Sequence, residues 1–403
     1  MNSKWFKTTI SDQAPLQRGF DITQKTANPG NVPVISSGGI SYYTDNPILS
    51  GPGVVIGRKG TLGTVFYVAS DYWPSDTTLW VTDFKGNNPK FVYYFYKTLS
   101  VMMLNLDVGS ANPTLNRNHL HSREILWTDR QSQDRIAEIL SGLDDKIELN
   151  RQMNRTLEQM ARALFKSWFI DFDPVHAKQR GEKPAGMDAE TAALFPDRFV
   201  EIDGKEVPEG WEWKTVDQLY TLRGGSTPST SNPEFWEGGT HAWTSPKDLS
   251  GLTTPFLTRT EKRITEAGTK VISSGLLPEG TVLLSSRAPV GYLAIASMPV
   301  SINQGYIALE STGALGRYFT LNLLQARLEE IKAMASGTTF PELSKKTFRT
   351  FTVLSPRYAV GSVFEFRVEE IYEKILQNVK ETENLSMIRD YLLPRLLSGE
   401  ITV

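Results

Sequence analysis

The sequence predicts an α+β fold in which two mixed α/β domains are separated by two long antiparallel coiled-coil helices, arranged as a pseudo-two-fold tandem repeat. Three observations lead to this prediction: the length of 403 residues, a repeat with a period of 228 residues, and one long apolar seam in each half. At ~100–200 residues per domain, the length suggests two or three domains. With 40% hydrophobic residues, the chain is apolar enough to build packed domains rather than remain disordered.

The repeat is visible as short matching segments. Residues 109–116 (GSANPTLN) resemble residues 337–344 (GTTFPELS), and the pair 125–126 (IL) resembles the pair 353–354 (VL), both at an offset of 228. Since a repeat of this length is about half of the chain, we interpret the protein as a tandem duplication.

The strongest element of each half is an amphipathic helix, predicted at about 131–169 and 360–393. Apolar residues recur in steps of three and four, and Asn150 occupies a position of the first seam to which Asn378 corresponds in the second. A buried Asn fixes register in coiled coils, so its recurrence favours pairing of the two helices within one chain. Two alternatives are that each helix only covers its own domain, or that the helices pair between chains. Arg389 stands where the first seam has Ala161, so the second seam is expected to splay there or to face a partner.

Antiparallel pairing of two helices of ~50–60 Å would place the domains at opposite ends of a rod. It would also relate the two halves by an approximate two-fold axis, a symmetry that duplex DNA shares.

The globular parts are expected to mix short strands and helices. Helices are predicted near 90–104 and 316–336, and a small hairpin at 199–207 turns at Asp203-Gly204. The runs of β-forming residues are bounded by Gly, Pro, Ser and Asp. Strands are predicted at 54–56, 65–68, 79–81, 282–284, 292–296 and 307–309.

Charge alternates along the chain. The net charge is +3 over 1–130, 0 over 131–170, −5 over 171–210, +3 over 211–357 and −3 over 358–403, which together give the overall −2. The two mildly basic blocks are the two expected globular domains, 171–210 is expected to be a connector, and the basic charge of the domains is compatible with nucleic acid as a partner.

Several classes of function lack their signature. The chain has no Cys and only four His, so thiol, zinc and iron–sulfur chemistry have no support. No phosphate-binding loop, dinucleotide fingerprint or Asn/Asp-Pro-Pro-aromatic methyltransferase element occurs. No apolar run approaches 18 residues, so no membrane partner is expected and the cytoplasm is the expected compartment.

One nuclease-like pattern is present. Asp197, Asp203 and Lys205 could in principle hold Mg²⁺ and polarise a water, which gives the alternative hypothesis of a fused restriction endonuclease with a centre near 196–205. The Asp-Gly dipeptide fits a hairpin turn better than a metal site.

Polar loops occur at equivalent places of the two repeats and supply cations, hydroxyls and amides beside small residues. Such groups can contact phosphates or base edges, and their recurrence in both halves makes them the candidate DNA-binding residues. The candidates are Ser36, Ser37, Arg58, Lys59, Asn112, Thr114, Asn116, Arg117, Thr244, Ser245, Lys247, Ser286, Arg287, Thr338, Thr339, Lys345 and Lys346.

The chain resembles the specificity subunits of Type I restriction-modification systems over essentially its full length. The resemblance is carried by residues 164–175 (LFKSWFIDFDPV), 283–291 (LLSSRAPVG) with 301–305 (SINQG), and 396–401 (LLSGEI).

The resemblance implies target recognition domains at 1–130 and 211–357 and conserved helical regions at 131–170 and 358–403. Each recognition domain would read one half of a bipartite double-stranded DNA target. The helices would act as a spacer and docking scaffold for two methyltransferase subunits and for restriction/translocase subunits. The chain itself would hold no cofactor and no metal and would be non-catalytic, because S-adenosylmethionine, ATP and Mg²⁺ would be bound by the partners.

Overall fold

The computed structural model describes residues 5–105, 114–311, 313, 315–337 and 341–403. The chain forms two compact units: unit 1 contains the chain up to Leu149 together with Thr382–Val403, and unit 2 contains Asn150–Glu381. Both boundaries fall within long helices, α5 (Arg130–Phe169) and α14 (Tyr358–Leu397).

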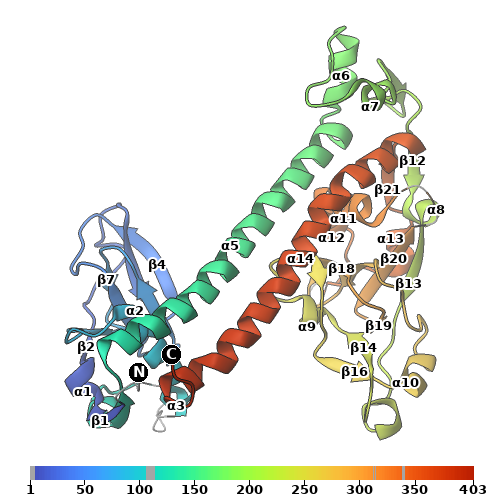
Figure 1. Cartoon of the computed structure of the whole chain (residues 1–403). Helices are drawn as coiled ribbons and strands as arrows, with labels where there is room; N and C mark the ends of the chain where they lie inside the picture. The colour runs from blue at the N-terminus through green and yellow to red at the C-terminus, as the bar shows by residue number, and fades with distance from the viewer. Residues whose placement is uncertain (1–4, 106–113, 312, 314, 338–340) are drawn as a thin grey trace. The chain divides into compact units, whose positions relative to one another are not determined.

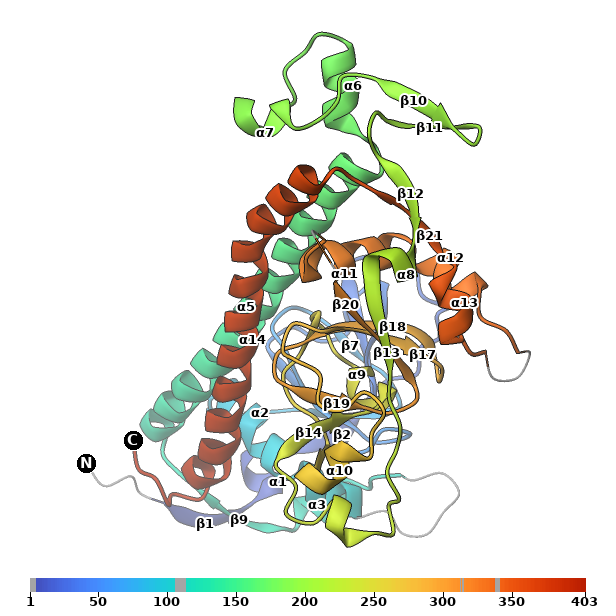
Figure 2. The same cartoon turned by 90° about the vertical axis from the view of Figure 1, so that its right-hand side faces the viewer.

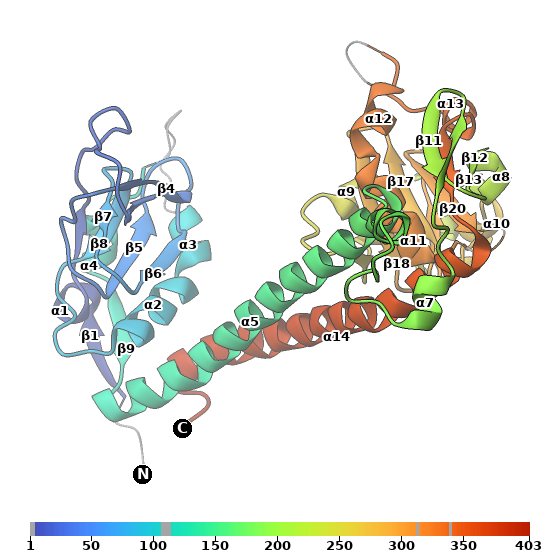
Figure 3. The same cartoon turned by 90° about the horizontal axis from the view of Figure 1, so that it is seen from above.

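A four-stranded antiparallel sheet with the strand order β2-β8-β5-β6 forms the centre of unit 1. All five residues of the central strand β5 are buried, because each face of the sheet is covered. Helix α2 packs on β5 and β6 from one side (Figure 3), where Val54 and Ile56 join its core, while Val55 packs with Ile35 and Tyr72 on the opposite side. The strands are β2 (Leu16–Arg18), β8 (Thr78–Val81), β5 (Gly53–Gly57) and β6 (Val65–Val68), and α2 spans Pro89–Thr98.

The layer under Val55 is a second, three-stranded sheet with the order β4-β3-β7. A two-stranded sheet of β1 and β9 leads the chain into and out of the domain. The remaining elements of unit 1 are β3 (Val32–Ser36), β4 (Gly39–Thr44), β7 (Trp73–Pro74), β1 (Phe6–Thr9), β9 (Glu124–Trp127), α1 (Ile10–Gln13), α3 (Ser100–Asn105) and α4 (Asn118–His121).

Unit 2 repeats this arrangement with a five-stranded sheet, β13-β20-β17-β18-β15, and a three-stranded sheet, β16-β14-β19. Alternate residues of its central strand again face opposite cores: Val282 and Leu284 face one, and Leu283 faces the other. The sheets consist of β13 (Tyr220–Gly224), β20 (Tyr306–Ser311), β17 (Val282–Ser286), β18 (Val290–Ala296), β15 (Phe256–Leu257), β16 (Lys262–Ile264), β14 (His241–Thr244) and β19 (Val300–Ile302). The other elements are β12 (Glu212–Thr215), β21 (Thr352–Ser355), α8 (Val216–Leu219), η1 (Pro233–Phe235), α9 (Pro246–Leu249), α10 (Glu266–Lys270), α11 (Arg317–Ala326), α12 (Leu328–Ala333) and α13 (Lys345–Arg349).

The predicted repeat is confirmed element by element. Helices α2, α3 and α5 and strand β9 return as α11, α12, α14 and β21, each with both bounds shifted by 228. The six strands predicted from the sequence are also confirmed. Each of the two predicted shorter helices is in fact two helices, α2 with α3 and α11 with α12, because the chain turns at Leu99 and Arg327.

Within unit 1, the ends of α5 and α14 pack against each other, and the paired residues show that the helices are antiparallel (Figure 1). Arg389 of α14 donates from Nη1 to Oδ1 of Asp144 at 2.7 Å, and its side chain is only 20% exposed. The expectation that the seam splays or faces a partner at Arg389 is therefore wrong: the cation is compensated by a carboxylate of the paired helix.

Within unit 2, the same two helices meet through buried amides. Asn378 Nδ2 donates to Asn154 Oδ1 at 2.8 Å, and Asn150 Nδ2 donates to Glu381 Oε2 at 2.8 Å. Asn150 and Asn378, which the repeat relates, thus each make a cross-helix hydrogen bond with a different partner. These contacts confirm that α5 and α14 pair within one chain.

Residues between α5 and β12 form a small projection of unit 2 (Figure 2). It contains α6 (Asp173–Gln179), α7 (Ala189–Ala193) and a hairpin of β10 (Phe199–Ile202) with β11 (Lys205–Pro208). Trp168 at the end of α5 packs against Phe195 with ring centroids 5.1 Å apart, so the projection has a core continuous with that of unit 2.

Candidate nucleic-acid interface

In unit 1, the loop after β5 is held from two sides. The backbone N–H groups of Arg58 and Lys59 donate to the carbonyl of Thr77 at 2.9 and 3.1 Å, and the N–H of Leu115 donates to the carbonyl of Arg58 at 2.9 Å. Lys59 and Thr114 consequently form an isolated antiparallel bridge. Two residues opposite each other in such a bridge direct their side chains to the same face, so Lys59 and Thr114 act as neighbours.

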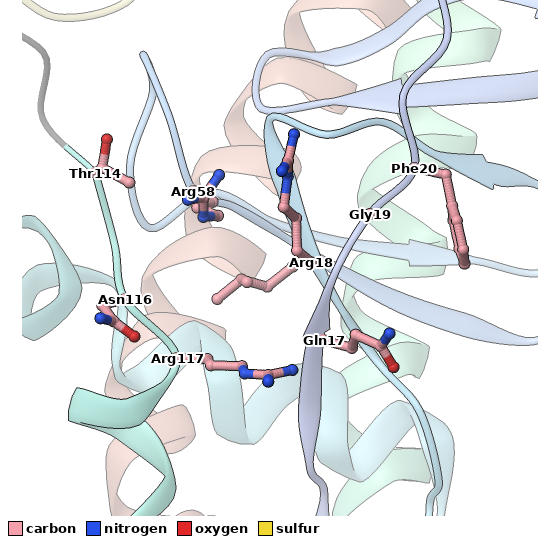
Figure 4. A pocket seen from close by; sticks show the side chains of 9 residues that line it. Gln17, Arg18, Gly19, Phe20, Arg58, Thr114, Asn116 and Arg117 are labelled. Atoms are coloured by element: carbon pink, nitrogen blue, oxygen red, sulfur yellow. The ribbon is translucent and has the colours of Figure 1, made fainter.

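Beside this bridge lies a recess of about 660 Å³ that collects three guanidinium groups (Figure 4). Arg18 pairs with Asp21 at 3.0 Å and with Asp76 at 3.4 Å. Arg58 and Arg117 have no ion pair within the described part of the chain. The recess is lined by Gln17, Arg18, Gly19, Phe20, Arg58, Leu79, Thr114, Asn116 and Arg117.

The positive charge of this recess affects a neighbouring imidazole. The pKa of His121 is lowered, first by burial and then by the charge of Arg117, and the imidazole accepts a hydrogen bond from the N–H of Leu16 at 2.9 Å. An imidazole nitrogen can accept a hydrogen bond only in the neutral ring. His121 therefore binds the backbone at the start of strand β2 and adds no charge to the recess.

Ser36 and Ser37, predicted as DNA-binding, form the turn between β3 and β4. Ser36 Oγ donates to the carbonyl of Gly39 at 3.0 Å, and the carbonyl of Ser37 accepts from Thr64 Oγ1 at 2.7 Å. Ser37 is 9% exposed. The Ser36 bond stabilises the turn itself, and the Ser37 bond joins the turn to Thr64 at the end of the loop that carries Lys59.

In unit 2, Arg287 and Glu342 form the equivalent bridge, and each lies 228 residues after its counterpart in the bridge of unit 1. The N–H of Leu343 donates to the carbonyl of Ser286 at 2.8 Å, as that of Leu115 does to Arg58. Ser286 itself is 3% exposed, so its backbone shapes the loop while its hydroxyl is buried.

A second recess of about 330 Å³ lies beside this bridge. Both cations of this recess lie close to a carboxylate, whereas among the described residues of the first recess only Arg18 does. Lys247 pairs with Glu261 at 2.8 Å, and Arg287 lies 4.0 Å from a carboxylate oxygen of Glu342. The recess is lined by Pro246, Lys247, Ser250, Arg287, Ala288, Tyr292, Asn303 and Gly305.

The remaining predicted residues of unit 2 lie elsewhere or are structural. Thr244 is fully buried against the hydroxyl of Tyr306, and Ser245 caps α9. Lys345 and Lys346 begin α13 and do not line the recess. The predicted residues Asn112, Thr338 and Thr339 lie outside the described residues.

Sequence reasoning missed five residues whose polar side chains line the recesses: Gln17, Arg18, Ser250, Tyr292 and Asn303. Arg18 was missed because it lies on strand β2, whereas the candidates were sought in polar loops with small residues. Asn303 stands in the segment 301–305 that carried the family resemblance, and this was the only signal that could have found it.

The nuclease-like pattern near 196–205 forms a hairpin. Asp203 and Gly204 are the two turn residues with φ of 53° and 72°, and Lys205 Nζ lies 4.9 Å from the ring centroid of Trp213. Among the described residues, no group of three His, Asp or Glu side chains could hold a metal ion. Likewise, none of the described helices is both long and apolar enough to cross a bilayer.

Comparison with known proteins identifies the family. The family model described as "Type I restriction modification DNA specificity domain" matches residues 2–159 and 208–359, that is, once in each half of the chain. The chain belongs to the family of Type I restriction-modification specificity subunits. Among its relatives, the Type I restriction enzyme HindI specificity subunit of Haemophilus influenzae is 34% identical over 330 residues, covering 72% of this chain and 71% of the relative.

Other specificity subunits agree with this assignment. The MjaIX specificity subunit of Methanocaldococcus jannaschii is 33% identical over 202 residues, covering 48% of this chain and 46% of the relative. The crystal structure of a Type I system S subunit from M. genitalium matches the fold with a TM-score of 0.65 at 20% identity, covering 98% of this chain and 96% of that one. The chain is thus the non-catalytic specificity subunit of such a system, with two DNA recognition domains.

Proposed function

We propose that each recognition domain of this specificity subunit reads one half of a bipartite DNA target. The observation that carries the proposal is the repeated bridge: Lys59 with Thr114 and Arg287 with Glu342 occupy the same register of the two domains, each beside a polar recess. A cation beside a recess rich in hydrogen-bonding groups can contact phosphates and base edges together. The different residues at equivalent positions imply that the two half-sites differ in sequence.

The paired helices would act as a spacer and as a docking scaffold for two methyltransferase subunits and for restriction/translocase subunits. Buried polar contacts in both units, Asp144 with Arg389 and Asn154 with Asn378, fix the register of α5 against α14, as a spacer requires. In this proposal S-adenosylmethionine, ATP and Mg²⁺ belong to the partner subunits, and the complex meets its DNA in the cytoplasm.

The test is a methylation map of DNA from a host that expresses this chain with its cognate modification subunits. A target with two specific segments and an unread interval supports the proposal. An uninterrupted target would contradict it. A matched control combines the same modification subunits with a chain in which residues of the recess of unit 2 are replaced by alanine. That control should lose preference in one segment only.

A further inference from the structure

Arg287 and Glu342 are opposite each other at the rim of the recess in unit 2. They form an antiparallel bridge, Arg287 Nη1 lies 4.0 Å from Glu342 Oε2, and their side chains are 38% and 52% exposed. Bridged residues direct their side chains to one face, so a cation and a carboxylate are presented there side by side.

The backbone around this pair is fixed before any ligand binds. The N–H of Glu342 donates to the carbonyl of Ser336 at 2.9 Å, and the N–H of Ser336 donates back to the carbonyl of Glu342 at 3.1 Å. On the other side of the pair, Ser285 Oγ donates to the carbonyl of Pro289 and accepts from the N–H of Tyr292, both at 2.7 Å. The described residues on both sides of the pair are therefore held by hydrogen bonds of their own.

A carboxylate is an unusual group on a surface that faces DNA, because phosphates repel it. It can gain free energy there by accepting a hydrogen bond from a base, or by pairing with a neighbouring cation. In the major groove, cytosine offers its N4 amine, whereas adenine places the N7 acceptor beside its N6 amine. A carboxylate therefore suits cytosine, and an amide, which both donates and accepts, suits adenine.

We infer that Arg287 and Glu342 together read a single C·G base pair, with Arg287 donating to O6 and N7 of guanine and Glu342 accepting from N4 of cytosine. The inference rests on the proposed function and specifies one position of the second half-site. The two side chains are close enough to meet the two bases of one pair. In the first domain the same register holds Lys59 and Thr114, which present a point charge and a hydroxyl, so the first half-site has a different requirement at its corresponding position.

The test uses the full chain assembled with its modification subunits and a library of duplexes randomised in the second half-site. The variant Glu342→Gln replaces the carboxylate by an amide of the same shape. We expect its preference for cytosine at one position to weaken about tenfold in relative binding, because the amide favours adenine there while Arg287 still favours the guanine that pairs with cytosine. The base preferences at all other positions of the DNA target, including the whole first half-site, should stay unchanged. Unchanged preferences there show that the variant is folded.

The matched control is Glu261→Gln, which removes a negative charge that pairs with Lys247 of the same recess. If Glu342 only neutralises Arg287, both glutamine variants will tighten binding to every sequence without a change of preference, and this result would overturn the inference. A second variant, Arg287→Lys, keeps the charge but loses the guanidinium fork. It should lower the preference for guanine at the same pair about tenfold while binding to unrelated DNA stays unchanged.

Failure of the inference and failure of the proposed function are distinguishable. If the wild-type complex selects a bipartite target but Glu342→Gln selects the same one, only the inference fails. If the wild-type complex selects no sequence at all, the proposed function fails and the inference falls with it.

Discussion

The side-chain amide of Asn378 donates a hydrogen bond of 2.8 Å to the side-chain oxygen of Asn154, and both residues are buried between α5 and α14. A buried polar pair in a largely apolar helical seam costs stability but favours a single register. Since the two residues come from helices more than 200 positions apart in sequence, this bond ties the first repeat to the second.

Cysteines at these two positions should form a disulfide within one chain. The native chain has no Cys, so Asn154→Cys with Asn378→Cys introduces the only two thiols. Oxidation should give a monomer of increased mobility on a non-reducing gel. The single variant Asn154→Cys is the control for linkage between chains. Disulfides found only between different chains would show that the helices pair intermolecularly.

Removal of one partner of the amide pair should cost more than removal of both. Asn378→Leu leaves Asn154 Oδ1 buried without its donor, so the free energy of unfolding should fall by about 1–3 kcal/mol. The double variant with Asn154→Leu removes both polar groups and should recover most of that loss, at the expense of a unique register. Denaturant unfolding of the wild type, of the single variants Asn378→Leu and Asn154→Leu and of the double variant measures these differences, and additive losses in the double variant would count against the pair.

Glu365 of α14 should make the stability of unit 2 depend on pH. Its carboxylate accepts from the first N–H groups of α11, those of Tyr318 and Phe319, at 3.0 and 2.8 Å. The close approach requires Gly316, because a Cβ there would lie 1.9 Å from Glu365 Cδ. Burial is the largest influence on this carboxyl and raises its pKa above the usual 4.5, although the two hydrogen bonds oppose that shift.

A carboxyl with a raised pKa binds its proton more tightly in the folded state. Its contribution to the free energy of unfolding therefore falls as pH rises from 4.5 through the raised folded value, and then stays constant. Glu365→Gln keeps an acceptor but does not titrate, so its unfolding midpoint should fall less across this window than that of the wild type. Glu365→Ala leaves both N–H groups unpaired and should lose about 1–3 kcal/mol, with the larger loss at low pH. Equal pH slopes for the wild type and the glutamine variant would contradict the assignment.

Lys59→Ala should distinguish a phosphate contact from a base contact in the first domain. If Lys59 contacts phosphate, the variant should weaken binding to all sequences and reduce the slope of log binding constant against log salt by ~1. If it contacts a base, the loss of ~1–3 kcal/mol should appear only for changes in the first half-site. Binding assays at several salt concentrations decide between the two. Unchanged binding would exclude this loop from the interface.

The sequence predicted the parts of the fold that leave a periodic or repeated pattern. The seams identified α5 and α14, and the 228-residue offset matched their bounds. The three-stranded sheets were missed, because the parallel pairing of Val34 with Trp73 joins short segments that carry no local signal. Arg389 was misinterpreted because the sequence pattern shows a cation in the seam but does not show its partner. Asp144, which accepts its hydrogen bond, is brought next to it only by the fold.

The candidate site was predicted less completely than the fold. The repeat led to Lys59, Thr114 and Arg287, which the structure places in equivalent bridges. A hydroxyl in a polar loop, however, can face solvent or satisfy the backbone, and the sequence does not distinguish these roles. Thr244 and Ser286, for example, were predicted to contact DNA, but both are buried.

The length of the paired helices should set the spacing of the DNA target. Two recognition domains held by a stiff spacer can reach the major groove on one face of B-DNA when their half-sites lie about one helical turn apart, ~34 Å or 10 bp, or a multiple of it. The bases between the half-sites would then be unread.

Insertion of three heptads, ~32 Å, into α5 and into the paired part of α14 should therefore lengthen the unread interval by about one helical turn, roughly 10 bp, and leave both half-sites unchanged. The double insertion keeps the seam in phase, whereas an insertion into α5 alone would shift Asn154 away from Asn378 and should destabilise the protein. Methylation mapping with the cognate modification subunits measures the interval. An insertion that alters the bases of a half-site but not the interval would contradict the idea that these helices measure DNA, because a spacer can change only the distance between readers and never what each of them reads.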